Sequence, residues 1–135
     1  MATDVRVNED DLEWDEDMRL LAGTPFSGVG FALYDDGSLR SESPYRDGFE
    51  EGTCREWHPN GRLRREWNAV RGCATELTEW HENGVVKCAG RYEYGAEIEY
   101  REWDDAGALL VHRQIDETTE LFAYVQSMRQ RGGTR

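Results

Sequence analysis

The sequence has no long hydrophobic run. No segment approaches the roughly 18 consecutive apolar residues of a membrane-spanning helix, and the acidic N-terminal stretch contains no apolar core of the signal-peptide type. Cysteine is also scarce: Cys54, Cys73 and Cys88 form no Cys-x-x-Cys pair, which argues against a disulfide framework or a zinc ribbon. We therefore expect a single soluble domain, residues 1–135, in the cytoplasm.

Basic residues are in the minority. The chain carries 28 acidic and 16 basic residues, a formal net charge of −12. Such a charge repels the phosphates of nucleic acids and the anionic surface of a membrane, so we expect neither as a direct partner. It favours encounter with a positively charged protein, and we expect a basic protein partner.

Motifs of catalysis and cofactor binding are missing as well. There is no Gly-x-Ser-x-Gly motif, and the glycines of the repeats fall singly at turns rather than in a phosphate-binding loop. His58 and His81 occupy equivalent positions about two strand spacings, or roughly 9.5 Å, apart, whereas two ligands of one zinc ion lie about 3 to 4 Å apart. The sequence predicts no catalytic residue, no metal site and no cofactor, and hence no enzyme.

What the sequence does contain is an internal repeat. Trp57, Trp80 and Trp103 are separated by 23 residues each; each follows a glutamate and precedes a glycine by four positions. A further unit lies upstream at an offset of 24, with Leu33 in the tryptophan position. A fixed period of this length is typical of repeat architectures, in which each unit packs on its neighbours.

Each unit has the pattern of one β-hairpin. Turn-forming residues recur at 35–37, 59–61, 82–84 and 105–107, each ending in glycine. After each turn the side chains alternate, so that Leu63, Arg65 and Trp67 point to one side of the strand. We predict a mainly β fold over residues 28–115, a single-layer antiparallel meander of hairpins with a period of about 23.

Both ends are expected to differ from the repeats. Residues 116–131 predict a C-terminal helix that caps the sheet, with Leu121, Val125 and Met128 on one face. Residues 1–27 are interpreted as an acidic arm followed by a degenerate first repeat. Within them, Glu9 to Asp17 holds seven acids in nine residues, and the pattern leaves open whether this stretch is an edge strand or a partly ordered arm.

Repeat position separates core candidates from binding candidates. The predicted repeat core consists of Trp57, Trp80, Trp103, Leu63, Val86 and Leu109. The glutamates before each tryptophan, Glu56, Glu79 and Glu102, are either a solvated face or an acidic row, spaced about 9.5 Å apart, that meets a basic partner. The N-terminal acids, with Glu9, Asp10, Asp11, Glu13 and Asp15 as candidates, are either a solvating arm or a mimic of phosphate charge that occupies a basic groove.

Four segments resemble a known family, the bacterial variant of the MORN repeat: Trp-His-Pro-Asn-Gly-Arg-Leu at 57–63, Trp-His-Glu-Asn-Gly-Val-Val at 80–86, Tyr-Arg-Asp-Gly at 45–48 and Gly-Thr-Pro-Phe-Ser-Gly at 23–28. The chain departs from the family pattern at Ala69, where an aromatic residue is expected, and at Thr118, where a fourth glycine would fall. The resemblance implies a single-layer sheet used for protein contact. It also implies a role as an antitoxin or immunity protein that neutralises a toxin. The alternative is a structural scaffold, or a protein that assembles through its exposed sheet edges.

Overall fold

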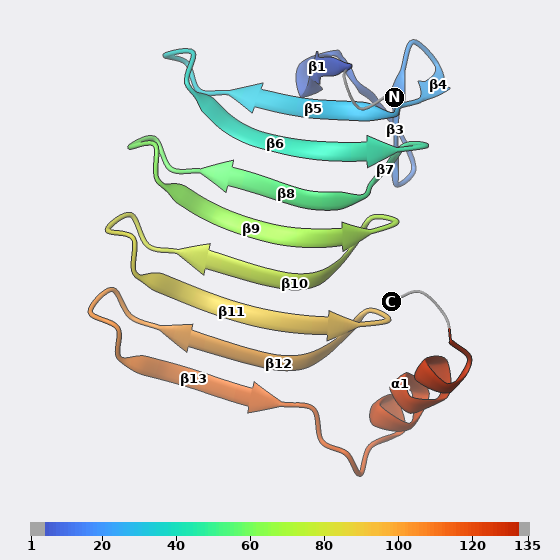
Figure 1. Cartoon of the computed structure of the whole chain (residues 1–135), viewed down its shortest axis with the longest axis vertical. Helices are drawn as coiled ribbons and strands as arrows, with labels where there is room; N and C mark the ends of the chain where they lie inside the picture. Colours follow the sequence, from blue (N-terminus) through green and yellow to red (C-terminus); the bar gives the residue numbers. More distant parts are fainter. Residues whose placement is uncertain (1–4, 133–135) are drawn as a thin grey trace.

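The computed structural model describes residues 5–132, and its main feature is one long sheet of ten strands (Figure 1). Eight strands run antiparallel in chain order: β5 (Gly28–Leu33), β6 (Leu39–Arg46), β8 (Gly52–Trp57), β9 (Leu63–Val70), β10 (Cys73–Trp80), β11 (Val86–Glu93), β12 (Ala96–Trp103) and β13 (Leu109–Gln114). The short strand β7 (Phe49–Glu50) pairs only with β6. The sheet ends in β1 on one side and β13 on the other, so it stays open, and the predicted mainly β meander is confirmed.

Two kinds of turn alternate along the meander. The predicted turns link β5 to β6, β8 to β9, β10 to β11 and β12 to β13. At the other ends of the strands, shorter turns join one unit to the next, as at Arg71 and Gly72, where both residues have positive φ (50° and 82°). Two successive positive φ angles define the tight turn that matches the right-handed twist of a hairpin, and glycine adopts the second without steric cost.

A β-bulge recurs beside every predicted turn. In β10 and β11, for example, Glu79 pairs with Cys88 and Trp80 with Val86, which leaves Lys87 without a partner in the register. The equivalent unpaired residues in the other hairpins are Arg40, Arg64 and Leu110. A bulge at the same place in each unit strengthens the local twist in the same way each time, so the repeat is preserved in backbone geometry as well as in sequence.

The N-terminal segment forms two additions to the meander. β1 (Arg6–Asn8) pairs in parallel with β5 and so provides the edge strand, and the 3-10 helix η2 (Glu9–Asp11) follows it. Residues 13–25 then form a separate three-stranded sheet of β2 (Glu13–Asp15), β3 (Met18–Leu21) and β4 (Thr24–Pro25). The acid-rich stretch is thus regular structure, because Leu12 is buried with Phe26 and Tyr45 and holds it on the sheet.

The predicted C-terminal helix is present as α1 (Glu120–Gln130). It begins later than predicted because Asp116 folds into a turn, accepting a hydrogen bond from the Thr118 backbone at 2.8 Å, and Thr119 then caps the helix. The predicted helix face is partly wrong. Val125 is fully buried against Ala96 and Ile98 and Met128 is half-buried, but Leu121 is 50% exposed, because the contact is centred on Val125 alone.

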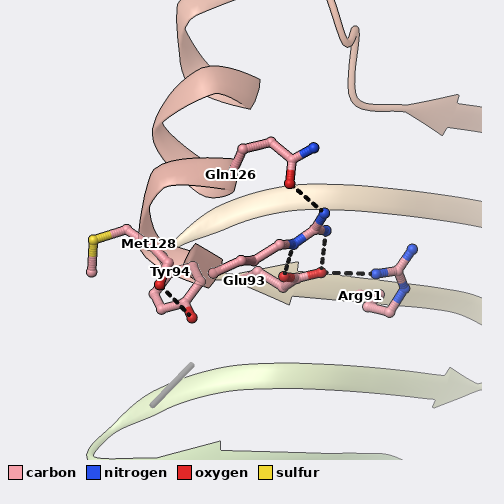
Figure 2. Close-up of polar contacts among 6 residues, drawn as sticks. Arg91, Glu93, Tyr94, Gln126 and Met128 are labelled. Carbon is pink, nitrogen blue, oxygen red and sulfur yellow. Dashed lines mark hydrogen bonds and ion pairs between the residues drawn. The ribbon is translucent and has the colours of Figure 1, made fainter. Parts of the chain in front are cut away.

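A buried carboxylate holds α1 on the sheet (Figure 2). Glu93, at the end of β11, accepts two hydrogen bonds from the Arg129 guanidinium at 2.7 and 2.8 Å and one from Arg91 at 3.0 Å. The Tyr94 hydroxyl donates to the Met128 carbonyl at 3.4 Å. Paired charges in a fork-like geometry fix orientation as well as position, so α1 has one defined placement over the end of β12.

The predicted repeat core is the part of the fold that needs correction. Trp57, Trp80, Trp103, Leu63 and Val86 are half-buried, and Leu109 is 54% exposed. Within residues 5–132 the hydrophobic clusters lie at the two ends, under η2 and under α1. Elsewhere the sheet has one layer, and no second layer covers large side chains beside the turns.

A candidate protein-binding face

The three repeat-equivalent glutamates lie in one row across the sheet. Neighbouring residues in the strand register place their side chains on the same face, and the register runs Ser41, Glu56, Arg65, Glu79, Cys88, Glu102, Val111. We call this side of the sheet the carboxylate face. The helix η2 contacts it at one end, where Ser41 donates a hydrogen bond to Glu9 at 3.2 Å.

Arg65 is the one basic residue in this row. Its guanidinium contacts Glu56 at 3.8 Å and Glu79 at 3.3 Å, while Glu102 accepts a hydrogen bond from the Tyr100 hydroxyl at 2.8 Å. The side chains of Glu56 and Glu79 are 29% and 21% exposed. These two carboxylates are thus half-buried and not fully solvated, and they share one guanidinium.

Glu50 adds a further negative charge that the sequence analysis did not single out. It accepts a hydrogen bond from the Trp67 indole at 3.4 Å and makes no ion pair within the described residues. Burial raises its pKa, and so, to a smaller degree, do the charges of Glu9 and Glu56. The only feature of the sequence that could have indicated a partly buried acid here is the position of Glu50 next to the apolar Phe49, close to a tight turn.

The same environment acts on Cys54. Burial, followed by the charge of Glu50, raises the pKa of this thiol to about 12. Cys54 and Cys88 are buried, whereas Cys73 is exposed. The buried thiols therefore stay protonated at neutral pH and are poor nucleophiles.

The N-terminal acids divide into two groups. Glu9 points into the protein, where it accepts a hydrogen bond from the Tyr45 hydroxyl at 3.0 Å and lies 3.6 Å from Arg19. Asp10, Asp11, Glu13 and Asp15 are exposed. Four of the five candidate acids of this segment are thus open to solvent, and the fifth holds the segment on the sheet.

A hollow of about 370 Å³ lies between the small N-terminal sheet and the tight turns, with Trp14, Arg19, Glu50 and Arg71 among its lining residues. Trp14 is 64% exposed, and the Arg19 guanidinium lies 4.0 Å from the centre of its ring. An exposed tryptophan beside a partly buried carboxylate provides an apolar and a negative contact next to the carboxylate face. Such contacts are typical of the central residues of protein interfaces.

The two histidines that the repeat places beside tryptophan have a structural explanation. The His58 Nε2 atom lies 2.8 Å from the Trp80 carbonyl, and His81 Nε2 lies 2.9 Å from the Trp103 carbonyl. Since a carbonyl only accepts, each ring nitrogen donates. In residues 5–132 no group of three or more histidine, cysteine or acidic side chains is arranged to hold a metal ion.

Comparison with known proteins bears on one hairpin. Residues 50–69 match the family model described as the MORN repeat variant. This segment runs from the end of β7 through β8 into β9, the unit that contains Glu56 and the His-Pro-Asn-Gly turn. The match supports the MORN-repeat part of the interpretation, and with it a repeat-based module for binding or scaffolding.

The other comparisons add little. No curated protein matches the chain. Among solved structures, the crystal structure of the GtfA/B complex bound to UDP and GlcNAc aligns with 11% sequence identity and a TM-score of 0.35, covering 87% of this chain and 26% of that chain. The chain thus spans about a quarter of the aligned protein, and a similarity of this size supports no further conclusion. Within the described residues, no helix has the length and apolar character to cross a membrane.

Proposed function

We propose that this protein is a non-catalytic binding module of the antitoxin or immunity kind, which acts in the cytoplasm and neutralises a basic protein toxin by direct contact. The observation that carries the proposal is the row of three half-buried glutamates on the carboxylate face, with Arg65 as its one basic residue. The resemblance of the repeats to antitoxin proteins supplies the biological role.

The row suits a partner with several cationic side chains. Glu56, Glu79 and Glu102 come from alternate strands, so adjacent carboxylates are separated by about 9.5 Å. Partial burial lowers the effective dielectric around each carboxylate, so an arginine or lysine that reaches it binds more strongly than at a fully hydrated site. A regular acidic row of this kind selects a partner by the spacing of its positive charges.

The exposed N-terminal acids contribute over a longer range. Asp10, Asp11, Glu13 and Asp15 add charge at one end of the sheet, and the whole chain has a formal net charge of −12. A field of one sign raises the rate at which an oppositely charged protein is encountered, and salt screens it. We therefore infer that these residues raise the association rate, whereas the carboxylate row stabilises the complex once it has formed.

The test begins with capture of partners from the native cell by the tagged wild-type chain and by the triple variant Glu56→Gln, Glu79→Gln, Glu102→Gln. The matched control is Glu66→Gln, Glu76→Gln, Glu99→Gln, which removes the same charge from other register rows, with Glu66 and Glu99 in ion pairs of their own. A basic protein that is retained by the wild type and the control, and lost with the triple variant, supports the proposal.

A second stage uses the purified partner. The protein should abolish the toxicity of that partner in cells that express both, and the association rate should fall as salt is added. Because Glu56 and Glu79 also pair with Arg65, the single variant Glu102→Gln is measured alongside, since among residues 5–132 Glu102 has no guanidinium partner to leave unpaired. Equal affinity of wild type and both variants for the partner would remove the carboxylate row from the interface.

The alternative of a self-assembling scaffold is favoured by a different observation, the unpaired outer edge of β13. A pure scaffold would associate with itself and would not rescue cells from a toxin. The two roles use different surfaces, so variants of the carboxylate row and variants of β13 separate them.

A further inference from the structure

The two ends of the sheet differ. At the first end, the short strand β1 (3 residues) pairs with β5 and covers its outer edge. At the other end β13 (6 residues) pairs with β12 alone, and within residues 5–132 no strand lies beyond it (Figure 1). The helix α1 packs on Ala96 and Ile98 and does not pair with β13. Among the described residues, β13 is therefore the longer open edge of the sheet.

The position of β13 in the repeat defines what this edge accepts. The second strands of the earlier hairpins, β6, β9 and β11, each pair on their outer side with an antiparallel strand, namely β8, β10 and β12. β13 is the next second strand in this series. Its backbone is thus shaped to continue the sheet with one more antiparallel strand.

The side chains of β13 are unusual for an exposed edge. Residues 109–114 include no acid in a chain that has 28 of them, and Leu109 and Leu110 are 54% and 58% exposed. Arg113 is occupied on its own face, with Glu97 at 2.9 Å. Proteins commonly protect an edge with charges, proline or a covering segment, and residues 109–114 contain no proline and few charges.

The direction of the backbone groups can be worked out from Ile115, whose N–H donates to the Ile98 carbonyl at 2.9 Å. Because backbone groups alternate in direction along a strand, Arg113 and Val111 also face β12. His112 and Gln114 then direct their N–H and C=O groups to the open edge. The bulge at Leu110 shifts the alternation by one residue. Since the Ala108 carbonyl accepts a hydrogen bond from the Asp104 N–H at 2.9 Å, it is Leu109 and not Leu110 that also faces the open edge.

We propose that this edge binds the β13 edge of a second copy of the chain, in antiparallel orientation, with Val111 on the two-fold axis. A two-fold axis normal to the sheet keeps each face continuous, so opposed residues must share a face. Centring on Val111 places Leu109 opposite His112 of the second copy, with Leu110 as the extra residue of the bulge. Leu109 and His112 share a face because they pair with Trp103 and Arg101 of β12. No like charges are opposed, and the outward backbone groups of Leu109 and His112 pair with each other.

The other registers are less favourable. Leu110 cannot lie on the axis, because it is the extra residue of the bulge. Centring on His112 places that residue directly opposite its own copy. The Val111 register pairs Leu109 with the second copy and places Leu110 beside it, which supplies the apolar area of the contact.

Net charge sets the salt dependence of this contact. Two chains of formal charge −12 repel each other, and salt screens that repulsion. Self-association should therefore strengthen as salt is added, whereas association with a basic partner should weaken. The dimer would also join two carboxylate faces into one, with Glu102 of each copy one strand away from β13.

Sedimentation equilibrium of the purified chain tests the proposal at several concentrations and two salt concentrations. The expected mass at high concentration and high salt is about twice the 15.6 kDa of the chain. Leu110→Lys should restore the monomer mass under the same conditions, because it places an ammonium group at the two-fold interface. The matched control Leu121→Lys adds the same charge at another exposed leucine and should behave as the wild type.

Disulfide trapping tests the register. In a Cys73→Ser background, which removes the exposed native thiol, Val111→Cys should form a covalent dimer with oxidised glutathione, because residues that face each other across a non-hydrogen-bonded pair lie about 4.5 Å apart at Cα. Gln114→Cys should not, since it lies opposite the 104–108 turn of the second copy, beyond the paired residues. A monomer at every salt concentration, or equal dimerisation of wild type and Leu110→Lys, would overturn the proposal.

Two outcomes separate this proposal from the proposed function. If Leu110→Lys leaves the chain as monomeric as the wild type but abolishes capture of the basic partner, the edge serves a strand of that partner and the homodimer is wrong. If the dimer forms and no toxin is neutralised, the homodimer stands and the proposed function fails.

Discussion

The His58 ring of one hairpin donates a hydrogen bond to the Trp80 carbonyl of the next, at 2.8 Å. The same bond recurs one unit later between His81 and Trp103, and one unit earlier the Tyr34 hydroxyl makes it to Trp57. Each turn is thus tied to the following hairpin by a side chain at the same repeat position. These bonds act where the sheet has only one layer, so they add a side-chain contact between units to the backbone pairing of the strands.

This arrangement predicts that His58→Phe destabilises the protein. Phenylalanine keeps the ring but removes the donor, and it leaves the Trp80 carbonyl without this partner. We expect a loss of about 1 kcal/mol in the free energy of unfolding, measured from the urea midpoint at constant m-value. His112→Phe is the control: its ring contacts Glu99 at an exposed position, and its loss should be close to zero. Equal effects of the two substitutions would contradict the role given to His58.

The sequence was sufficient to find the repeat, the turns and the meander, because these depend on local spacing and on residues that favour turns. It placed His58 and His81 as equivalent but could not name their partners, since each bond joins residues 22 positions apart. The last hairpin that the structure describes has Asp104 at this position, and the part of the chain described after it forms α1 and not a further hairpin. The Asp104 carboxylate accepts hydrogen bonds from the Ala106 and Ala108 backbones within its own turn.

The sequence was less informative about burial. Trp57 and Leu109 have the hydrophobic character of core residues, yet a single layer cannot cover them, and Leu109 lies on the last strand. The buried acid Glu93 was missed for a related reason. Its partner Arg129 lies 36 residues away on α1, where a basic residue near the end of a helix is already favoured by the helix dipole.

The helix contact gives a second prediction. Val125 is fully buried, so Val125→Ala should cost about 2 kcal/mol in the free energy of unfolding, from two lost methyl groups and the space they leave. Leu121→Ala should cost much less, although Leu121 is the larger side chain, because it is 50% exposed. Denaturant unfolding of both variants checks this order. A larger loss for Leu121→Ala than for Val125→Ala would mean that Leu121 belongs to the buried face of α1, as the sequence predicted.

Thiol reactivity gives a third prediction. In the native state Cys73 should react with a disulfide reagent at the rate of an exposed thiol, while Cys54 and Cys88 react only on unfolding. Counting released chromophore should therefore give one fast thiol in buffer and three in denaturant. Cys73→Ser should abolish the fast reaction and leave the slow one unchanged, whereas a second fast thiol would show that the carboxylate face is more open than the structure has it.

The pH dependence of Cys54 follows from the same burial. Its pKa is raised to about 12 in the folded state, so between the unfolded thiol pKa of about 8.5 and that value the folded chain binds more protons than the unfolded chain. The stability from this group is present below that range and is lost as the pH rises through it. Cys54→Ala should therefore flatten the fall in the unfolding free energy between about pH 9 and 11, compared with the wild type, when measured by denaturant unfolding.

Glu50 provides the last prediction. Its raised pKa lowers the stability of the protein at neutral pH, whereas the raised pKa of Cys54 contributes to it. The pKa of Glu50 is raised by burial, so at pH 7 the folded state holds an ionised carboxylate in surroundings that disfavour the charge. Glu50→Gln keeps an oxygen to accept the Trp67 hydrogen bond and removes the charge, so it should stabilise the protein at pH 7. The gain should shrink as the pH falls through the folded pKa and vanish below the unfolded pKa of about 4.3, where both states are protonated. Urea unfolding at pH 7 and pH 4 checks this, with the exposed Glu76→Gln as a control that should show a smaller change.

Glu50→Gln should also weaken capture of the basic partner. A carboxylate whose charge is unfavourable in the free protein gains most from a cation that the partner brings. A Glu50→Gln variant that is less stable at pH 7 than the wild type would mean that the charge is already compensated within the fold, and Glu50 would then be a structural residue and not part of the binding face.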